Sequence, residues 1–80
     1  MSKRKKILIC GCTGFIGMNL VDYFNKLNEY EVHGVALRRI SSNLSENRFY
    51  RVDLTDKKQV NKFFKENDFD IIIQAAASTS

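Results

Sequence analysis

The stretch KILICGCTGFIG at positions 6–17 joins two different hydrophobic patterns through a cluster of glycines. Residues 6–10 form a run that is apolar after Lys6 and includes β-branched side chains, and Gly11 ends the run, which is typical of a short buried strand. From Phe15 onward the apolar residues recur with the period of a helix. The sequence therefore predicts a strand that turns sharply through glycines into a helix.

The segment 15–27 is expected to be an amphipathic helix of about three turns that ends at Asn28. Its apolar stripe consists of side chains three or four positions apart, namely Ile16, Leu20, Phe24 and Leu27. Residues 31–37 are predicted to form a second strand, and we expect His33 to be packed inside it. The polar, serine-rich residues 38–48 show no helical stripe and are predicted to form a loop.

The second half of the chain continues the alternation of strands and helices. Residues 49–53 are predicted to form a short third strand. Asp56 then has the position of a helix N-cap, with Gln59 as its capping-box partner. The buried face of this second helix is expected to consist of Val60, Phe63 and Phe64. The helix ends at 67–68, and residues 69–74 form a fourth strand that is apolar on both faces.

Strands that alternate with helices in this way indicate an α/β fold with a Rossmann-like parallel sheet. Right-handed crossover connections place the strands in the order 3-2-1-4. The fourth strand lies at an edge in that order, although edge strands normally carry charges or are covered. We therefore expect residues 1–80 to be the N-terminal part of one domain, with the sheet truncated after the fourth strand and no substrate domain present.

The glycines of the turn, spaced Gly-x-x-Gly-x-x-Gly, each have a physical reason. Gly11 allows a tight turn off the strand, Gly14 lets the backbone approach a pyrophosphate, and Gly17 lets the helix pack closely on the sheet. The free N–H groups and the positive dipole end of the helix then favour a phosphate. A turn between strand and helix is the context of a dinucleotide-binding fingerprint. The alternative is a glycine-rich turn that binds nothing.

Residues 13–17, Thr-Gly-Phe-Ile-Gly, resemble the fingerprint of the extended short-chain dehydrogenases/reductases, and the resemblance runs in order along essentially the whole chain. These are NAD(P)-dependent nucleotide-sugar epimerases, dehydratases and reductases, and this chain looks like the GDP-fucose-synthase-like or GDP-mannose-dehydratase-like members. The resemblance implies an NAD(P)-binding Rossmann domain that handles nucleotide sugars. It implies that the cofactor is bound in this turn by Gly11, Thr13, Gly14, Phe15, Ile16 and Gly17.

Two further segments are similar to cofactor-binding parts of that family. Asp53 and Leu54 open an Asp-Leu-x-Asp sequence, in which the family's aspartate accepts a hydrogen bond from the adenine amino group and the next N–H contacts the ring. The alternative is that Asp53 merely ends a strand. After the fourth strand, small side chains would let the cofactor lie across the strand ends, or would simply fill a tight corner; they are Ala75, Ala76 and Ala77. Gln74 replaces the histidine that is more frequent in the family.

The end of the second strand is expected to select the cofactor. An acid about 20 residues beyond the glycine turn binds the ribose hydroxyls of NAD, whereas an arginine accommodates the extra phosphate of NADP. Ala36 stands where the acid is usual, and Arg38 and Arg39 follow it. We therefore expect NADP, with NAD as the alternative. A solvated basic loop is the other interpretation of the two arginines.

No catalytic residue is expected within the 80 residues. The family's catalytic pair is Tyr-x-x-x-Lys, and none of the three tyrosines is followed by a lysine at that spacing. The leading hypothesis is the dinucleotide-binding half of a nucleotide-sugar epimerase, dehydratase or reductase. The alternative is a non-catalytic NAD(P)-binding or sensing module, so whether the chain is part of an enzyme stays open. The resemblance also allows a homodimer of the intact protein.

Composition excludes several other classes. The chain is 44% hydrophobic and 28% charged, which is ordinary for a globular protein. Its net charge of +4 comes largely from four cations at positions 3–6, which we interpret as a solvated leader. We expect no nucleic-acid partner, because the aromatic residues fall mostly on core faces, and no membrane span, because no apolar run approaches about 20 residues. Cys10 and Cys12 indicate reduced thiols in a cytoplasmic protein without a metal site.

Overall fold

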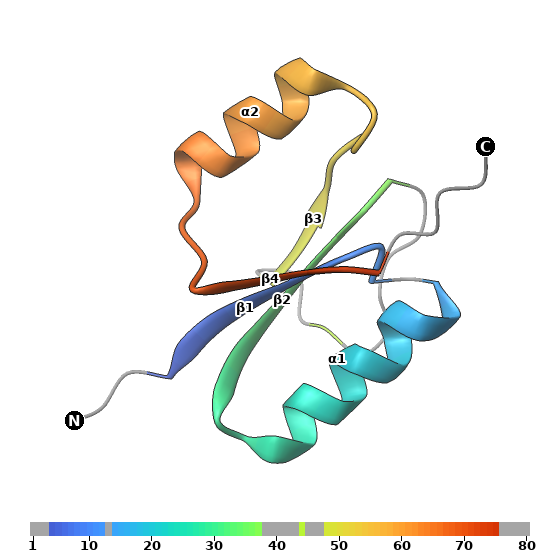
Figure 1. The fold of residues 1–80 in the computed structure, drawn as a ribbon, viewed down its shortest axis with the longest axis vertical. Coiled ribbons are helices and arrows are strands. Elements are labelled where there is room, and N and C mark those ends of the chain that lie inside the picture. Colours follow the sequence, from blue (N-terminus) through green and yellow to red (C-terminus); the bar gives the residue numbers. More distant parts are fainter. Residues whose placement is uncertain (1–3, 13, 38–43, 45–47, 76–80) are drawn as a thin grey trace.

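The computed structural model describes residues 4–12, 14–37, 44 and 48–75 of the chain. Figure 1 shows a sheet flanked by two helices. The elements follow in the order β1 (Lys5–Cys10), α1 (Phe15–Leu27), β2 (Tyr30–Ala36), β3 (Phe49–Arg51), α2 (Lys57–Glu66) and β4 (Ile71–Gln74). The α/β alternation predicted from the sequence is confirmed.

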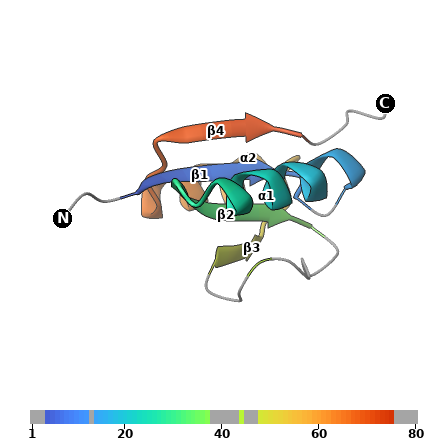
Figure 2. The ribbon, with the colours of Figure 1, turned by 90° about the horizontal axis from the view of Figure 1, so that it is seen from below.

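The strands form one parallel sheet. β1 pairs with β2 and with β4, and β2 pairs with β3, so that the order is β3-β2-β1-β4. Figure 2 shows the strands side by side in this order, with α1 in front of them. The Rossmann-like order 3-2-1-4 is therefore confirmed. In a parallel sheet the carboxyl ends of the strands share one edge, where the turn after β1 and residues 52–54 after β3 are found.

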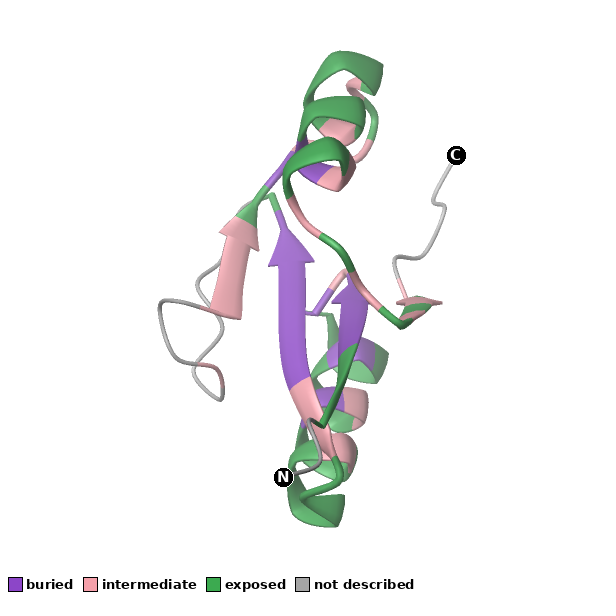
Figure 3. Ribbon diagram, turned by 90° about the vertical axis from the view of Figure 1, so that its left-hand side faces the viewer, coloured by how far each residue is buried: buried purple, intermediate pink, exposed green. Residues whose placement is uncertain are grey.

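Side chains alternate across β1, so its two faces contribute to two apolar clusters. Ile7 and Ile9 pack on the α1 side together with Val21, whereas Leu8 packs on the α2 side together with Phe63. Full burial of such a side chain stabilises the fold by roughly 1.5–3 kcal/mol relative to exposure. Figure 3 shows that burial is concentrated in the two central strands. The glycine turn thus follows the most firmly packed part of the sheet.

Helix α1 has the bounds that the sequence predicts, but the face it buries coincides only in part with the expected apolar stripe. Gly17 and Val21 are its buried residues, whereas Ile16 is 63% exposed. Two members of the expected stripe, Leu20 and Phe24, pack at the margin of the cluster. The reason is that Gly17 has no side chain, so this face can lie directly against the glycine turn. The stripe predicted from apolar side chains alone was therefore right at Leu20 and Phe24 and wrong at Ile16 and Leu27, which are exposed.

The helix ends are those that the sequence predicts. Asn28 ends α1 in the left-handed conformation, with φ 55°. At the start of α2, the Asp56 carboxylate accepts hydrogen bonds from the N–H groups of Lys58 and Gln59, at 3.0 and 3.4 Å. The Gln59 amide donates in turn to Asp56, and its oxygen accepts a hydrogen bond from the N–H of Asp53. The side chain of Gln59 therefore joins the end of β3 to the start of α2.

His33 is packed in the core on the α2 side of β2, as predicted. Its Nε2 lies 2.5 Å from the Glu31 carboxylate, and its Nδ1 lies 3.2 Å from the Tyr50 hydroxyl. The ring stacks on Tyr50 and meets the ring of Phe69 at an angle. Because both ring nitrogens have partners, His33 is a satisfied core residue.

Candidate functional site

The turn after β1 is tied to the neighbouring strand. Gly11 has a φ of 79°, a conformation that side chains rarely adopt. The N–H groups of Gly11 and Cys12 both donate to the carbonyl oxygen of Val35 in β2, at 2.8 and 3.3 Å. The turn after β1 is therefore hydrogen-bonded to the end of β2, and α1 begins a few residues later at Phe15.

The N-terminus of α1 carries no cap from a side chain in the described part of the chain. Gly14 is the N-cap residue, and no acidic residue lies in the first turn. Gly14 donates its N–H to Gly11, and Met18 donates to Gly14. The first N–H groups of a helix have no partner inside the helix. Unlike those of α2, which Asp56 caps, the first N–H groups of α1 have no side-chain cap among the described residues, and such groups favour an anion.

The fold explains two of the three glycines in this turn. Gly11 is needed for its positive φ. Gly17 is needed because a Cβ there would lie 2.1 Å from the carbonyl oxygen of Gly11. Gly14 has a φ of −74°, and a Cβ there would be 3.6 Å from its nearest neighbour, which is ordinary contact. Its lack of a side chain therefore serves something other than the packing of the described residues.

The exposed residues beside Gly14 frame this site. Phe15 is 84% exposed at the first position of α1, and Ile16 is also exposed. On the other side, the N–H of Ala75 donates to the carbonyl oxygen of Cys10 at 2.8 Å. The end of β4 thus lies directly beside the end of β1, and Ala75 packs against the α1-side cluster.

Asp53 and Leu54 follow β3 at the same edge of the sheet. The N–H and hydroxyl of Thr55 both donate to Asp53 Oδ1, at 2.9 and 2.6 Å. These hydrogen bonds hold the pKa of the Asp53 carboxyl below its ordinary value. Leu54 packs against the α2-side cluster. Asp53 is therefore a charged acceptor in a fixed turn, separated from the glycine turn by the end of β2.

The structure thus brings together the glycine turn and Ala75, with Asp53 and Leu54 further along the same edge. The remaining residues predicted for this site lie outside the described residues; they are Thr13, Arg38, Arg39, Ala76 and Ala77.

Three residues that the sequence analysis did not assign to this site also shape the turn. Val35 supplies the carbonyl oxygen that holds it, Cys12 is fully buried beneath it, and Gly34 faces Cys12 from β2. The available signal was Gly34 itself, because a glycine within an apolar strand often marks the close approach of another backbone.

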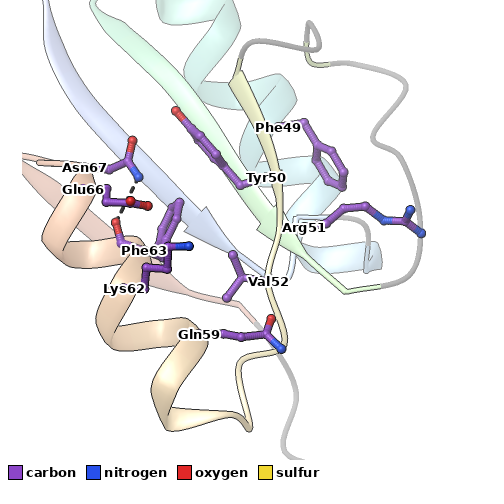
Figure 4. A pocket seen from close by; sticks show the side chains of 9 residues that line it. All are labelled: Phe49, Tyr50, Arg51, Val52, Gln59, Lys62, Phe63, Glu66 and Asn67. Carbon is purple, nitrogen blue, oxygen red and sulfur yellow. Dashed lines mark hydrogen bonds between the residues drawn. The ribbon is translucent and has the colours of Figure 1, made fainter.

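A separate hollow of about 500 Å³ lies between β3 and α2 (Figure 4). Residues 49–52 line one wall, and Gln59, Lys62 and Phe63 belong to the other. It shares no residue with the glycine turn, and it opens on the α2 face of the sheet. We therefore do not assign it to the same site.

The thiols near the turn are not activated. Burial raises the pKa of Cys10 above its ordinary value and raises that of Cys12 to about 11. Both groups are therefore protonated at neutral pH and are poor nucleophiles. Among the described residues, no three His, Cys, Asp or Glu side chains gather in a way that could hold a metal ion. In that same part of the chain, no helix has the length and apolar character to cross a membrane.

The parallel sheet in the order β3-β2-β1-β4, with a glycine turn from β1 into α1, defines a Rossmann-like α/β fragment. The model of the NAD dependent epimerase/dehydratase family matches residues 7–80. The chain belongs to this family, which implies a nicotinamide dinucleotide as cofactor. A search of curated proteins finds no match.

Proposed function

We propose that this chain binds the pyrophosphate and adenosine of NADP, with NAD as the alternative, as the dinucleotide-binding half of a nucleotide-sugar epimerase, dehydratase or reductase. The pyrophosphate would be held by the N–H groups at the start of α1, and the adenine by Asp53 and the N–H of Leu54. The uncapped helix end and the ionised Asp53 support these roles. When bound, the cofactor supplies hydride transfer to and from a sugar carbon.

Gly14 is the observation that carries this proposal. The fold has room for a side chain at this position, and its backbone angles are ordinary. A glycine with no packing reason, at an uncapped helix N-terminus, suits the close approach of a pyrophosphate to the backbone. The exposure of Gly14 and Phe15 leaves that approach open.

The NADP preference rests on the end of β2. Ala36 is buried there, and its methyl side chain offers no carboxylate to the ribose hydroxyls. Arg38 and Arg39 follow in the sequence and supply the guanidinium groups that suit a phosphate. A cytoplasmic location and a homodimer of the intact protein belong to the same proposal. The free thiols of Cys10 and Cys12 support the location.

A non-catalytic NAD(P)-binding or sensing module is the second candidate. The 80 residues do not distinguish it from the enzyme, because none of their tyrosines begins a Tyr-x-x-x-Lys sequence. The two candidates make the same prediction for cofactor binding. They differ in the intact protein, where a Tyr-x-x-x-Lys in the same reading frame would favour the enzyme.

Calorimetric titration of NADPH into the 80-residue chain and its Gly14→Val variant tests the shared part of the proposal. We expect the variant to lose binding, because the added side chain blocks the approach of the pyrophosphate, while its circular dichroism spectrum stays that of the wild type. Asn61→Val is the matched control, since it adds the same side chain on the exposed surface of α2. Unchanged affinity in Gly14→Val, or no binding by the folded wild type, would overturn the proposal.

A further inference from the structure

The side chain of Cys12 fills the space that a side chain on Gly34 would need. Cys12 is fully buried. A Cβ built on Gly34 would lie 2.6 Å from Cys12 Sγ and 2.7 Å from Cys12 Cβ. It would also lie 2.6 Å from Leu44 Cδ1. Because real Cβ atoms essentially never come within 3.0 Å of such neighbours, strand β2 can carry no side chain here unless both Cys12 and Leu44 move.

Cys12 is held from the other side by α1. A Cβ on Gly17 would lie 2.9 Å from the Cα of Cys12. Residue 12 is therefore enclosed between β2 below it and the first turn of α1 above it. Its own N–H, together with that of Gly11, is bonded to Val35, the neighbour of Gly34 in β2.

This enclosure links the size of one side chain to the position of the whole turn. A larger residue at 34, or a smaller one at 12, changes the distance between the turn and β2. The turn cannot compensate elsewhere, because Gly17 already touches it closely. Since the turn would hold the pyrophosphate through its backbone N–H groups, displacements of well under 1 Å matter for binding.

We propose that Cys12 and Gly34 are a size-matched pair of positioning residues that sets the height of the glycine turn above the sheet and so determines the affinity for the dinucleotide. The statement about affinity rests on the proposed function. The statement about the position of the turn does not rest on the proposed function, because it concerns contacts within the chain. Neither residue needs to touch the cofactor.

The test separates the two neighbours that Gly34→Ala would displace. If the new methyl group pushes Cys12, the turn moves, and removing the Cys12 side chain should repair it. If any loss of NADPH binding comes instead from the displacement of Leu44, truncating Leu44 should restore the binding. The variants are therefore Gly34→Ala alone, Gly34→Ala with Cys12→Gly, and Gly34→Ala with Leu44→Ala, the last being the matched control.

Two quantities are measured in each variant. The first is the dissociation constant of NADPH. The second is the hydrogen-exchange rate of the Gly11 and Cys12 amides, which are bonded to Val35 in the wild type. We expect Gly34→Ala to weaken NADPH binding about tenfold or more and to speed exchange at both amides. Cys12→Gly should restore both quantities in the double variant, whereas Leu44→Ala should restore neither.

The opposite pattern of rescue, or wild-type affinity and exchange in Gly34→Ala, would overturn the proposal. If Gly34→Ala does not fold, Cys12→Ala provides the second test. It should raise the exchange rate of the two amides and weaken NADPH binding severalfold, and wild-type values of both would overturn the proposal. If the wild type binds no NADPH, the proposed function fails, and the exchange data alone decide whether the pair positions the turn.

Discussion

The carbonyl oxygen of Gly11 lies where a side chain on Gly17 would begin. A Cβ built on Gly17 would be 2.1 Å from that oxygen, so the first turn of α1 is seated directly on the turn that follows β1. The same oxygen is the nearest neighbour of a Cβ built on Gly14, but there the distance is 3.6 Å. Two glycines of one turn thus face one atom, and only one of them is sterically required.

The Gly17→Ala variant should therefore be much less stable than Gly14→Ala. We expect the free energy of unfolding to fall by about 1–3 kcal/mol for Gly17→Ala, as is usual for an overpacked site. For Gly14→Ala the loss should stay below about 1 kcal/mol, because alanine fits there without a clash although it is a poorer N-cap residue than glycine. Urea denaturation followed by circular dichroism measures both. Equal losses in the two variants would contradict the close seating of α1.

The cap of α2 should contribute measurably to stability. Asp56→Ala removes the acceptor for the N–H groups of Lys58 and Gln59 and the partner of the Gln59 side chain. We expect a loss of about 0.5–2 kcal/mol in the free energy of unfolding. Asp68→Ala removes the same charge from an exposed position beyond the helix and serves as the control. A loss of the same size in the control would assign the effect to net charge instead.

Glu31 should make stability depend on pH in the acid range. Its hydrogen bond with His33 is the main cause that lowers the pKa of the Glu31 carboxyl below its ordinary value of 4.5. A depressed pKa adds stability above the unfolded pKa, and this contribution disappears as the pH falls through the folded value. The stability advantage of wild type over Glu31→Gln should therefore be full above pH ~5.5 and shrink toward pH ~3.

Urea midpoints measured across this range decide the matter. Glu29→Gln, which changes an exposed carboxylate just before β2, controls for the loss of one charge. An advantage over Glu31→Gln that stays constant from pH ~5.5 to ~3 would rule out the linkage.

Preference for NADP should depend on Arg38 and Arg39. A guanidinium–phosphate contact contributes roughly 1.5–3 kcal/mol, which corresponds to an about 10- to 150-fold preference over NAD. Titration of both cofactors into wild type and the double variant Arg38→Ala, Arg39→Ala measures it, and the double variant should bind them about equally. A preference that survives the double change, or its absence in wild type, would count against these arginines.

The sequence predicted the fold well because its strongest signals are local. Three residues mark the ends of elements through backbone and capping chemistry that does not depend on the rest of the fold. They are Gly11 after a β-branched run, Asn28 after an amphipathic run and Asp56 before another. The strand order then followed from general rules of crossover connections. Strand lengths were less accurate. Both β3 and β4 are shorter than predicted. After β3, the Asp53 side chain accepts hydrogen bonds from Thr55, and the chain forms a turn there.

The buried face of α1 and the packing between the glycine turn and β2 could not be predicted in the same way. Periodicity counts apolar side chains, so it favoured Ile16 and Leu27, which are exposed, and passed over Gly17, which is buried. The contact between Cys12 and Gly34 joins residues in different elements and depends on how closely the turn approaches β2. Such contacts arise from packing distances, which a one-dimensional pattern does not contain.

The central place of β1 has a consequence for how the chain acquires its structure. Lys6 donates its N–H to the Asp70 carboxylate, a partner 64 positions away, and β4 completes the pairing of β1. Pairings between residues so far apart in sequence are slow to form, because a large loop must close first. During synthesis, β1 leaves the ribosome before the other described elements, yet one of its two edges stays open until residues 71–74 emerge. Of the four described strands, the first to be made is thus the last to gain its second neighbour.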